Sequence, residues 1–229
     1  MILIENLNVS YADNHVLKGL NLKIPSTSIH GLVGLNGSGK TTLLNTMFGL
    51  KEKQAGSISY NSVPIAKNKI AYLESVNFFY PLITGKEYLK LFQSRNLTFN
   101  IDKWNELFEL PLNKLVEDYS TGMKKKLAFM GVICLDREIL ILDEPFNGVD
   151  LETVQKIKSV LIKLKERTTI IITSHILESL LSLCDMLSYL NNGGIQFTKD
   201  KKDFSSVENE IFSVHQERLD SQIESLLGK

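Results

Sequence analysis

The chain has 229 residues, of which 43% are hydrophobic, and its 26 basic side chains balance 26 acidic ones. Such a chain can bury one substantial core, while its neutrality gives no support for broad electrostatic binding to nucleic acid or to an anionic membrane. Two cysteines, Cys134 and Cys184, lie in apolar segments without metal-ligand spacing and predict reduced, buried thiols. Neither a signal-peptide pattern nor an apolar run of roughly 20 residues is found, so we expect a cytoplasmic protein.

The first half of the chain predicts strands that precede and follow one helix. Strand-like segments cover 2–11, 15–24 and 28–34, and turn-forming residues separate them. A glycine-rich loop follows the third segment. The residues 40–50 then carry apolar side chains at helical spacing, with Gly49 as a plausible end. Short strands are expected over 56–60 and 68–73.

The middle of the chain is predominantly amphipathic and predicts helices. The segments 84–96 and 102–115 have apolar residues on one face, with Thr84 and Asp102 as candidate N-caps. A third helix is expected over 120–135, capped by Ser120. These helices predict a small helical subdomain, approximately 84–136, inserted between two halves of a larger fold.

The last part of the chain returns to alternating strands and helices. Apolar strands over 138–145 and 168–175 flank an amphipathic helix over 151–166. A hairpin is expected around residues 191–194, and a tail helix over 214–229. This alternation predicts an α/β fold with a mostly parallel sheet, preceded by an antiparallel β region.

The stretch "GLNGSGKT" places a phosphate-binding pattern between a predicted strand and a predicted helix. Its glycines let successive backbone N–H groups turn inward as an anion-binding nest, and the helix that follows adds its positive end. Lysine and threonine at its end suit the β- and γ-phosphates and Mg²⁺. The pattern predicts binding of a nucleoside triphosphate. The residues expected to bind it are Gly34, Leu35, Asn36, Gly37, Ser38, Gly39, Lys40, Thr41 and Thr42.

Two adjacent acids end the apolar strand of "ILILDEP". We expect Asp143 to hold the hydration shell of Mg²⁺ opposite Thr41, and Glu144 to orient or deprotonate the attacking water. Two carboxylates at the end of a strand could also be an ordinary junction with a loop. The phosphate-binding pattern upstream favours the catalytic interpretation.

Further motifs, in the same order along the chain, resemble those of the ATP-binding cassette (ABC) ATPases of membrane transporters. "YSTGMKKKL" at 119–127 resembles the signature sequence of that family, usually written LSGGQ. "NGVD" ends at Asp150 and is similar to the loop after the two acids, and "TSH" ends at His175, like the family's switch histidine. With the aromatic Tyr11 upstream, the resemblance covers about 2–197.

The resemblance implies that two cassettes pair head to tail, with each ATP between the phosphate loop of one and the signature of the other. Ser120 and Gly122 would face the γ-phosphate bound by the partner, and Asp150 would cross the interface. His175 would contact the γ-phosphate as a catalytic residue beside Glu144. Tyr11 would stack on adenine, with Val16 near the base.

Simpler interpretations remain open for several of these residues. Ser120 could be only a helix cap, His175 a structural histidine at a strand end, and Tyr11 a cover for the edge of the core. The lysine run 124–126 is interpreted as a solvated helix face rather than a nucleic-acid site.

The sequence departs from the family pattern at Glu74, in the signature and in its short helical subdomain. Glu74 stands where a glutamine usually touches Mg²⁺ and the membrane subunit, and it is expected with Thr41 and Asp143 in the metal set. Exporter-type cassettes often carry glutamate there, so Glu74 favours export. Thr121 and Met123 replace the usual glycine and glutamine of the signature. The aromatics 78–80 are candidate contacts for a membrane subunit, or they could pack within the domain.

The resemblance therefore implies one ABC domain over 1–229: a P-loop NTPase core with a mostly parallel sheet, an N-terminal antiparallel β region and the helical subdomain, ending in a tail over 198–229. It implies ATP and Mg²⁺ as cofactors, with a second ABC ATPase subunit, identical or closely related, and an integral membrane transporter subunit as partners. The cassette would sit on the cytoplasmic face of the membrane and power export, without binding nucleic acid. The alternative is an ABC ATPase that switches a soluble assembly.

Overall fold

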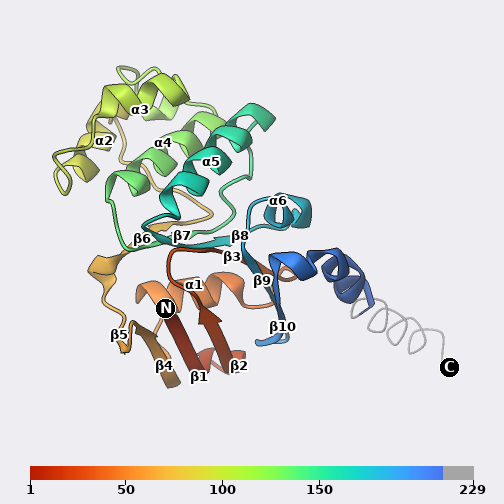
Figure 1. Ribbon diagram of the computed structural model, residues 1–229. Helices are drawn as coiled ribbons and strands as arrows, with labels where there is room; N and C mark the ends of the chain where they lie inside the picture. Colours follow the sequence, from red (N-terminus) through yellow and green to blue (C-terminus); the bar gives the residue numbers. More distant parts are fainter. Residues whose placement is uncertain (214–229) are drawn as a thin grey trace, which may run out of the picture.

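Two β-sheets of different kinds form the centre of the structure, a computed structural model that describes residues 1–213 (Figure 1). The helix expected over 214–229 lies outside the described residues. Figure 1 places the antiparallel sheet on one side of the mixed sheet and a group of helices on the other. The α/β class predicted from the alternating elements is confirmed.

The antiparallel sheet of this part of the chain has four strands in the order β2-β1-β4-β5. Apolar residues of β1 point to one face and are buried there, which gives the alternation expected of a half-covered sheet. The segment around 56–60 belongs here because β4 pairs antiparallel with β1. The bounds are β1 (Ile2–Tyr11), β2 (Asn14–Ile24), β4 (Ala55–Tyr60) and β5 (Val63–Pro64).

The larger sheet has the strand order β10-β9-β3-β8-β7-β6 within the described residues. All neighbouring strands run parallel except β10, which forms the predicted hairpin with β9. The strands β3, β7 and β8 are buried along their whole length, and their sequences are predominantly apolar, with His30 in β3 and a threonine at each end of β8 as the polar exceptions. The bounds are β3 (Ile29–Val33), β6 (Ile70–Leu73), β7 (Ile139–Leu142), β8 (Thr169–Thr173), β9 (Met186–Asn191) and β10 (Gly194–Asp200).

Helix α1 (Lys40–Phe48) lies between the two sheets. Its Leu43, Leu44 and Met47 are buried in one cluster with side chains from β1, β2 and the central strands. Helix α1 starts directly after the glycine-rich loop that leaves β3. Its amino-terminal end is therefore fixed at the carboxyl edge of the larger sheet.

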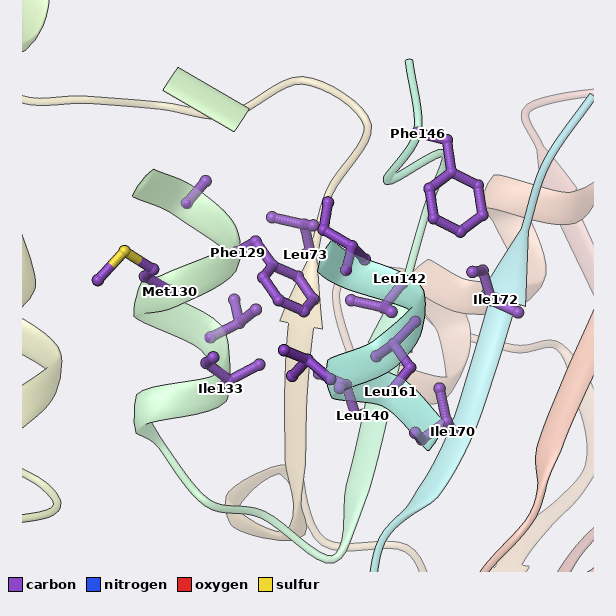
Figure 2. Close-up of a cluster of buried hydrophobic side chains, with 14 of the residues drawn as sticks. Leu73, Phe129, Met130, Ile133, Leu140, Leu142, Phe146, Leu161, Ile170 and Ile172 are labelled. Atoms are coloured by element: carbon purple, nitrogen blue, oxygen red, sulfur yellow. The ribbon is translucent and has the colours of Figure 1, made fainter. Parts of the chain in front are cut away.

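The opposite face of the larger sheet is covered by helices α4 and α5, as Figure 2 shows. Phe129 and Ile133 of α4 and Leu161 of α5 pack against Leu140 and Ile170 of the sheet. Each fully buried side chain of this size contributes about 1.5–3 kcal/mol. The helices on this side are α2 (Gly85–Gln93), α3 (Ile101–Phe108), α4 (Thr121–Cys134) and α5 (Leu151–Leu164).

The helix caps agree with the sequence in two cases and differ in one. Thr84 and Ser120 cap α2 and α4 as predicted, and Thr84 forms a reciprocal capping box with Glu87. Asp102 was the wrong cap for α3, because the Asn100 side chain accepts the hydrogen bond from the Lys103 N–H at 3.0 Å. Asp102 instead lies in the first turn, where its negative charge interacts favourably with the positive end of the helix dipole.

Several short elements had no clear sequence signal. The predicted helix over 102–115 ends at Phe108, where Glu109 adopts a left-handed backbone shortly before a proline.

Within residues 1–213 no helix combines the length and the apolar character needed to cross a membrane. The remaining elements are the 3-10 helices Lys67–Lys69, Val116–Asp118 and Lys201–Ser206, the helix α6 (Leu177–Leu181), and a helical segment over 207–213.

Both cysteines are buried and unpaired in the described part of the chain, as the sequence predicted. Burial raises the pKa of the Cys134 thiol to about 11 and that of Cys184 still further. Both sulfurs are therefore protonated and unreactive near neutral pH.

A buried histidine ties β3 to its neighbours just before the glycine-rich loop. His30 has no exposed surface, and its Nε2 lies 2.9 Å from Ser188 Oγ, which lies 2.6 Å from Thr198 Oγ1. His30 Nδ1 has no hydrogen-bond partner among the described residues. Burial lowers the pKa of His30 to about 4, so the ring is neutral in the folded protein at neutral pH.

This burial predicts a loss of stability in mild acid. In the unfolded chain His30 takes up a proton near pH 6.5, but in the folded protein only near pH 4, so stability is complete above pH 6.5 and falls as the pH drops towards 4. We expect His30→Gln to lose up to about 3 kcal/mol of this pH dependence. Urea unfolding between pH 7 and 4 measures it.

The exposed His15 provides the matched control, and His15→Gln should keep the pH dependence of the unmodified protein. An identical pH dependence in His30→Gln and the unmodified protein would show that His30 does not cause it.

Candidate nucleotide-binding site

The glycine-rich loop between β3 and α1 folds around the side chain of Lys40. Lys40 is only 9% exposed, and its Nζ donates hydrogen bonds to Gly34 O at 2.7 Å and to Leu35 O at 3.1 Å. Two glycines are required for this shape. Gly39 has φ +111°, and a Cβ on Gly34 would lie 2.4 Å from Leu190 O. The loop is therefore a closed cradle of backbone groups around one ammonium.

Asp143, at the end of β7, joins two other segments of the site. Its carboxylate accepts hydrogen bonds from Thr41 Oγ1 at 2.8 Å and from Thr173 Oγ1 at 2.6 Å. Asp143 is buried, and its backbone N–H donates to Leu73 O at the end of β6. The carboxyl ends of β6, β7 and β8 and the start of α1 thus meet at one carboxylate.

Glu144 follows in a left-handed backbone conformation with φ +52°. Its N–H donates to Thr173 Oγ1 at 3.0 Å, which holds the backbone in place. Its Oε2 accepts a hydrogen bond from the His175 N–H at 3.2 Å and lies 2.9 Å from His175 Nδ1. A left-handed backbone at a non-glycine residue costs about 1–3 kcal/mol.

A pocket of about 420 Å³ opens beside these groups. Tyr11 and Val16 line one part of it, and the phosphate loop with Asp143 and Glu144 lines another. Lys51 Nζ lies 4.2 Å from the centre of the Tyr11 ring, a cation–π contact on one face of the aromatic group. The described residues that line the pocket are Tyr11, Asn14, Val16, Asn36, Gly37, Gly39, Lys40, Thr41, Thr42, Ser75, Asp143 and Glu144.

The charges suit a polyanion. Burial lowers the pKa of Lys40, and the nearby Glu144 and Asp143 carboxylates offset part of this effect. The hydrogen bonds of Lys40 Nζ go to neutral carbonyl groups, so its charge is available to a phosphate. Ser38 Oγ is buried in the loop without a hydrogen-bond partner among the described residues.

The oxygen atoms of Thr41 and Asp143 also fit Mg²⁺. A hydroxyl and a carboxylate oxygen lie in direct contact beside the phosphate loop. Mg²⁺ prefers oxygen ligands and binds through one or two protein groups together with phosphates and water. Among residues 1–213, no group of three or more His, Cys, Asp or Glu side chains could hold a metal. The chemistry of this pair fits a metal bound jointly with phosphates.

Eight residues expected at the site do not line this pocket in the described part of the chain: Gly34, Leu35, Ser38, Glu74, Ser120, Gly122, Asp150 and His175. Gly34, Leu35 and His175 instead line a neighbouring pocket that shares Asn36 with this one. Glu74 is exposed, and its neighbour Ser75 forms the wall instead. Ser120 accepts the Met123 N–H as the cap of α4, and Asp150 accepts the Thr153 N–H at 2.8 Å as the cap of α5. A Cβ on Gly122 would lie 3.1 Å from Gly148 O, so the starts of α4 and α5 adjoin each other.

Four contributors to the site were missed in the sequence: Asn14 and Ser75, which line the pocket, and Thr173 and Lys125, which bond to residues around it. Thr173 bonds both acids, but as the last residue of an apolar strand it looked like a strand end. Lys125 belongs to the lysine run interpreted as a solvated face, which is wrong for this residue. It is buried, and its Nζ donates to Ser75 O at 2.9 Å. Its spacing of three and four residues from the apolar Ala128 and Phe129, on one face of the predicted helix, was the available signal.

Comparisons with known proteins agree with this geometry. The model of the ABC transporter family matches residues 17–147. The bacitracin transport ATP-binding protein BcrA of Enterococcus faecalis is 32% identical over 82% of this chain and 66% of its own length. The lantibiotic transport ATP-binding protein SrtF of Streptococcus pyogenes is 30% identical over 93% of this chain and 96% of its own.

A solved structure has the same fold. The dimeric structure of MJ0796, described as a bacterial ABC transporter cassette, superposes with a TM-score of 0.78. The alignment covers 88% of this chain and 99% of that cassette at 22% sequence identity.

The family model spans more than half of the chain, and it ends within the loop that begins with the two acids. A phosphate cradle around Lys40 and the acids at the end of β7 lie inside that match. The chain therefore belongs to the ABC transporter family, as an ATP-binding subunit whose ATPase activity powers transport.

Proposed function

We propose that this chain binds MgATP between two cassettes and hydrolyses it to drive export through separate membrane subunits, from the cytoplasmic face of the membrane. The observation that carries the proposal is the hydrogen-bonded series Thr41–Asp143–Thr173–Glu144–His175 at the mouth of the phosphate loop. It places a hydroxyl and two carboxylates at one end of the pocket, with the His175 imidazole in contact with the second carboxylate.

Each residue has a distinct role in this proposal. The loop amides and Lys40 bind the β- and γ-phosphates, and Tyr11 and Val16 hold the base. Glu144 accepts a proton from the attacking water, and His175, in contact with Glu144 Oε2, orients it and meets the γ-phosphate. The left-handed backbone at Glu144 directs its carboxylate towards His175 rather than along the strand.

Thr41 and Asp143 would hold Mg²⁺. The metal supplies charge neutralisation at the phosphate oxygens. The hydroxyl and carboxylate are already in contact at 2.8 Å, so little rearrangement of the chain is needed. Glu74 stays a prediction as a third ligand, because it is exposed outside the pocket wall.

A second cassette would complete the site. Ser120 and Gly122 lie at the positive end of α4 and outside the pocket of their own chain. The similar cassette MJ0796 has been solved as a dimer. We therefore assign Ser120, Gly122 and Asp150 to contacts across a head-to-tail dimer, formed by two copies or by one copy and a close relative.

The contact with a membrane subunit is assigned to two exposed aromatic side chains on the loop after β6. Phe78 and Tyr80 are 72% and 58% exposed and lie in edge-to-face contact. Phe79 between them points inward and packs on Tyr88. The loop starts at the pocket wall with Ser75, so it connects the nucleotide to the exposed pair. Aromatic pairs of this kind are typical interface anchors.

Export is favoured by the names of two relatives, which refer to bacitracin and lantibiotic transport. The similarity of the segment around Glu74 to exporter-type cassettes points in the same direction. The membrane subunits, rather than this chain, would select the transported substance.

Replacing the proposed base should abolish turnover without abolishing binding. We expect Glu144→Gln to lower kcat by about 10²–10⁴-fold, because the amide cannot accept the proton. ATP affinity should persist, and a stable dimer should accumulate with ATP. Phosphate release and light scattering measure the two effects. The exposed Glu52→Gln provides the control, and normal turnover in Glu144→Gln would refute the assignment of the base.

The trans contact of Ser120 can be separated from its role as a cap. Ser120→Asn keeps a good capping oxygen but changes the group presented to the partner. We expect turnover to fall about tenfold or more, the effect of losing one hydrogen bond to a charged group. ATP binding by the monomer should not change. Full activity of this variant, or weaker binding by the monomer, would contradict the trans contact.

Copurification identifies the partner. A tagged Glu144→Gln chain, isolated with ATP from gently solubilised native membranes, should carry a polytopic membrane protein in stoichiometric amount. The double variant Phe78→Ser, Tyr80→Ser should lose that protein and keep ATP binding, because it removes an apolar anchor remote from the phosphates. Leu97→Ser alters another exposed apolar residue and should retain the partner.

If only soluble proteins copurified reproducibly, the result would refute export and favour an ABC ATPase that switches a soluble assembly. Retention of the membrane protein by the double variant would place its docking surface elsewhere.

A further inference from the structure

We propose that Lys125 is a positioning residue that ties helix α4 to the loop at the nucleotide pocket, so that the signature end of α4 and the loop move together. The effect of Lys125 on the chain's own pocket depends only on the ATPase activity of the family. Its effect on a nucleotide bound by a partner cassette rests on the proposed function.

The contact is specific to one lysine of the run. Lys125 is 6% exposed, and its Nζ donates to Ser75 O at 2.9 Å. Lys124 Nζ donates to Glu117 O at 3.3 Å and Lys126 Nζ to Phe108 O at 3.2 Å, so both of these bonds stay within the helical region 84–136. Lys125 therefore bridges from this region to the loop after β6.

The bridge ends at the part of the pocket where the phosphates are expected. Ser75 forms the pocket wall together with Thr41, Asp143 and Glu144. Burial lowers the pKa of Lys125, while Asp143 and then Glu144 partly offset this effect, which places the ammonium within electrostatic reach of both acids. A displacement of Ser75 would therefore disturb Asp143, Glu144 and the bound phosphates more than the adenine ring.

Helix α4 can carry the displacement because it is rigid. Lys125 lies five residues after Ser120, about 7.5 Å along the helix axis. Farther along, Phe129 and Ile133 pack against the sheet (Figure 2). The same loop leads from Ser75 to the exposed Phe78 and Tyr80. One hydrogen bond thus connects the signature, the chain's own pocket and the exposed aromatic pair.

Stability alone gives a poor account of this residue. A buried charge pays a desolvation cost, and apolar residues of similar volume are often as stable or more stable in its place. A methionine could fill the same space, but it could not bind the Ser75 carbonyl. The hydrogen bond to the loop is the property that methionine lacks.

The test compares Lys125→Met with Lys124→Met in the purified full chain. We expect Lys125→Met to lower kcat for ATP about tenfold or more, the value of one lost hydrogen bond to a charged group. The KM for ATP should change less than about twofold, because base stacking and the phosphate loop are intact. Amide hydrogen exchange should become faster over 74–80 and stay slow in α4. Lys124→Met should match the unmodified chain in all three measurements.

Two further variants keep the test decisive if Lys125→Met does not fold. Lys125→Gln retains a neutral donor and should show a smaller loss of kcat than Lys125→Met. Ser75→Gly loosens the loop while the lysine stays in place, and it should reproduce the loss of kcat and the faster amide exchange over 74–80. Equal kcat in Lys125→Met and Lys124→Met, or unchanged exchange over 74–80, would overturn the proposal.

These measurements use the isolated chain, so they do not depend on export or on a membrane partner. Failure of the copurification would leave them unaffected. Turnover that survives in Glu144→Gln would refute the assignment of Glu144 as the base. Faster amide hydrogen exchange over 74–80 in Lys125→Met alone would still support the positioning role of Lys125.

Discussion

The buried carboxylate of Asp143 is the interaction on which the rest of the site depends. It accepts hydrogen bonds from hydroxyl groups of α1 and β8, and its own backbone N–H donates a hydrogen bond to the end of β6. Hydrogen bonds to a charged group contribute about 1.5–3 kcal/mol each, and leaving such a charge unpaired is more costly still. Segments separated by 102 residues in the sequence are thereby held together. The positions of Glu144, of the glycine-rich loop and of His175 depend on this contact.

Parts of this arrangement could be predicted because their signals are local. The glycine pattern around Lys40, the acids at the end of an apolar strand and the caps at Thr84 and Ser120 each depend on a few consecutive residues. Asp102 was misplaced by two residues because a neighbouring asparagine could supply the same cap. The roles of Thr173 and Ser75 depend on which strands adjoin, and no local pattern encodes that pairing, whereas the helical spacing of Lys125 from Ala128 and Phe129 did indicate its burial.

The two halves of the proposed catalytic unit are built differently. The half with the phosphate loop is fixed by a sheet that is buried on both faces, so its geometry is rigid. The half with the signature sits at the start of α4, with exposed residues and few long-range bonds at its tip. A rigid cradle paired with a more adjustable cover is what an ATP-driven contact between two copies requires, because closure must be reversible.

The left-handed backbone at Glu144 has a consequence for the balance between activity and stability. A residue without a Cβ would adopt φ +52° with little strain, whereas glutamate there is held by the bond to Thr173. The fold would therefore be relaxed at this position by the very change that removes the carboxylate. Selection for a more heat-resistant chain and selection for a faster one pull in opposite directions at this single residue.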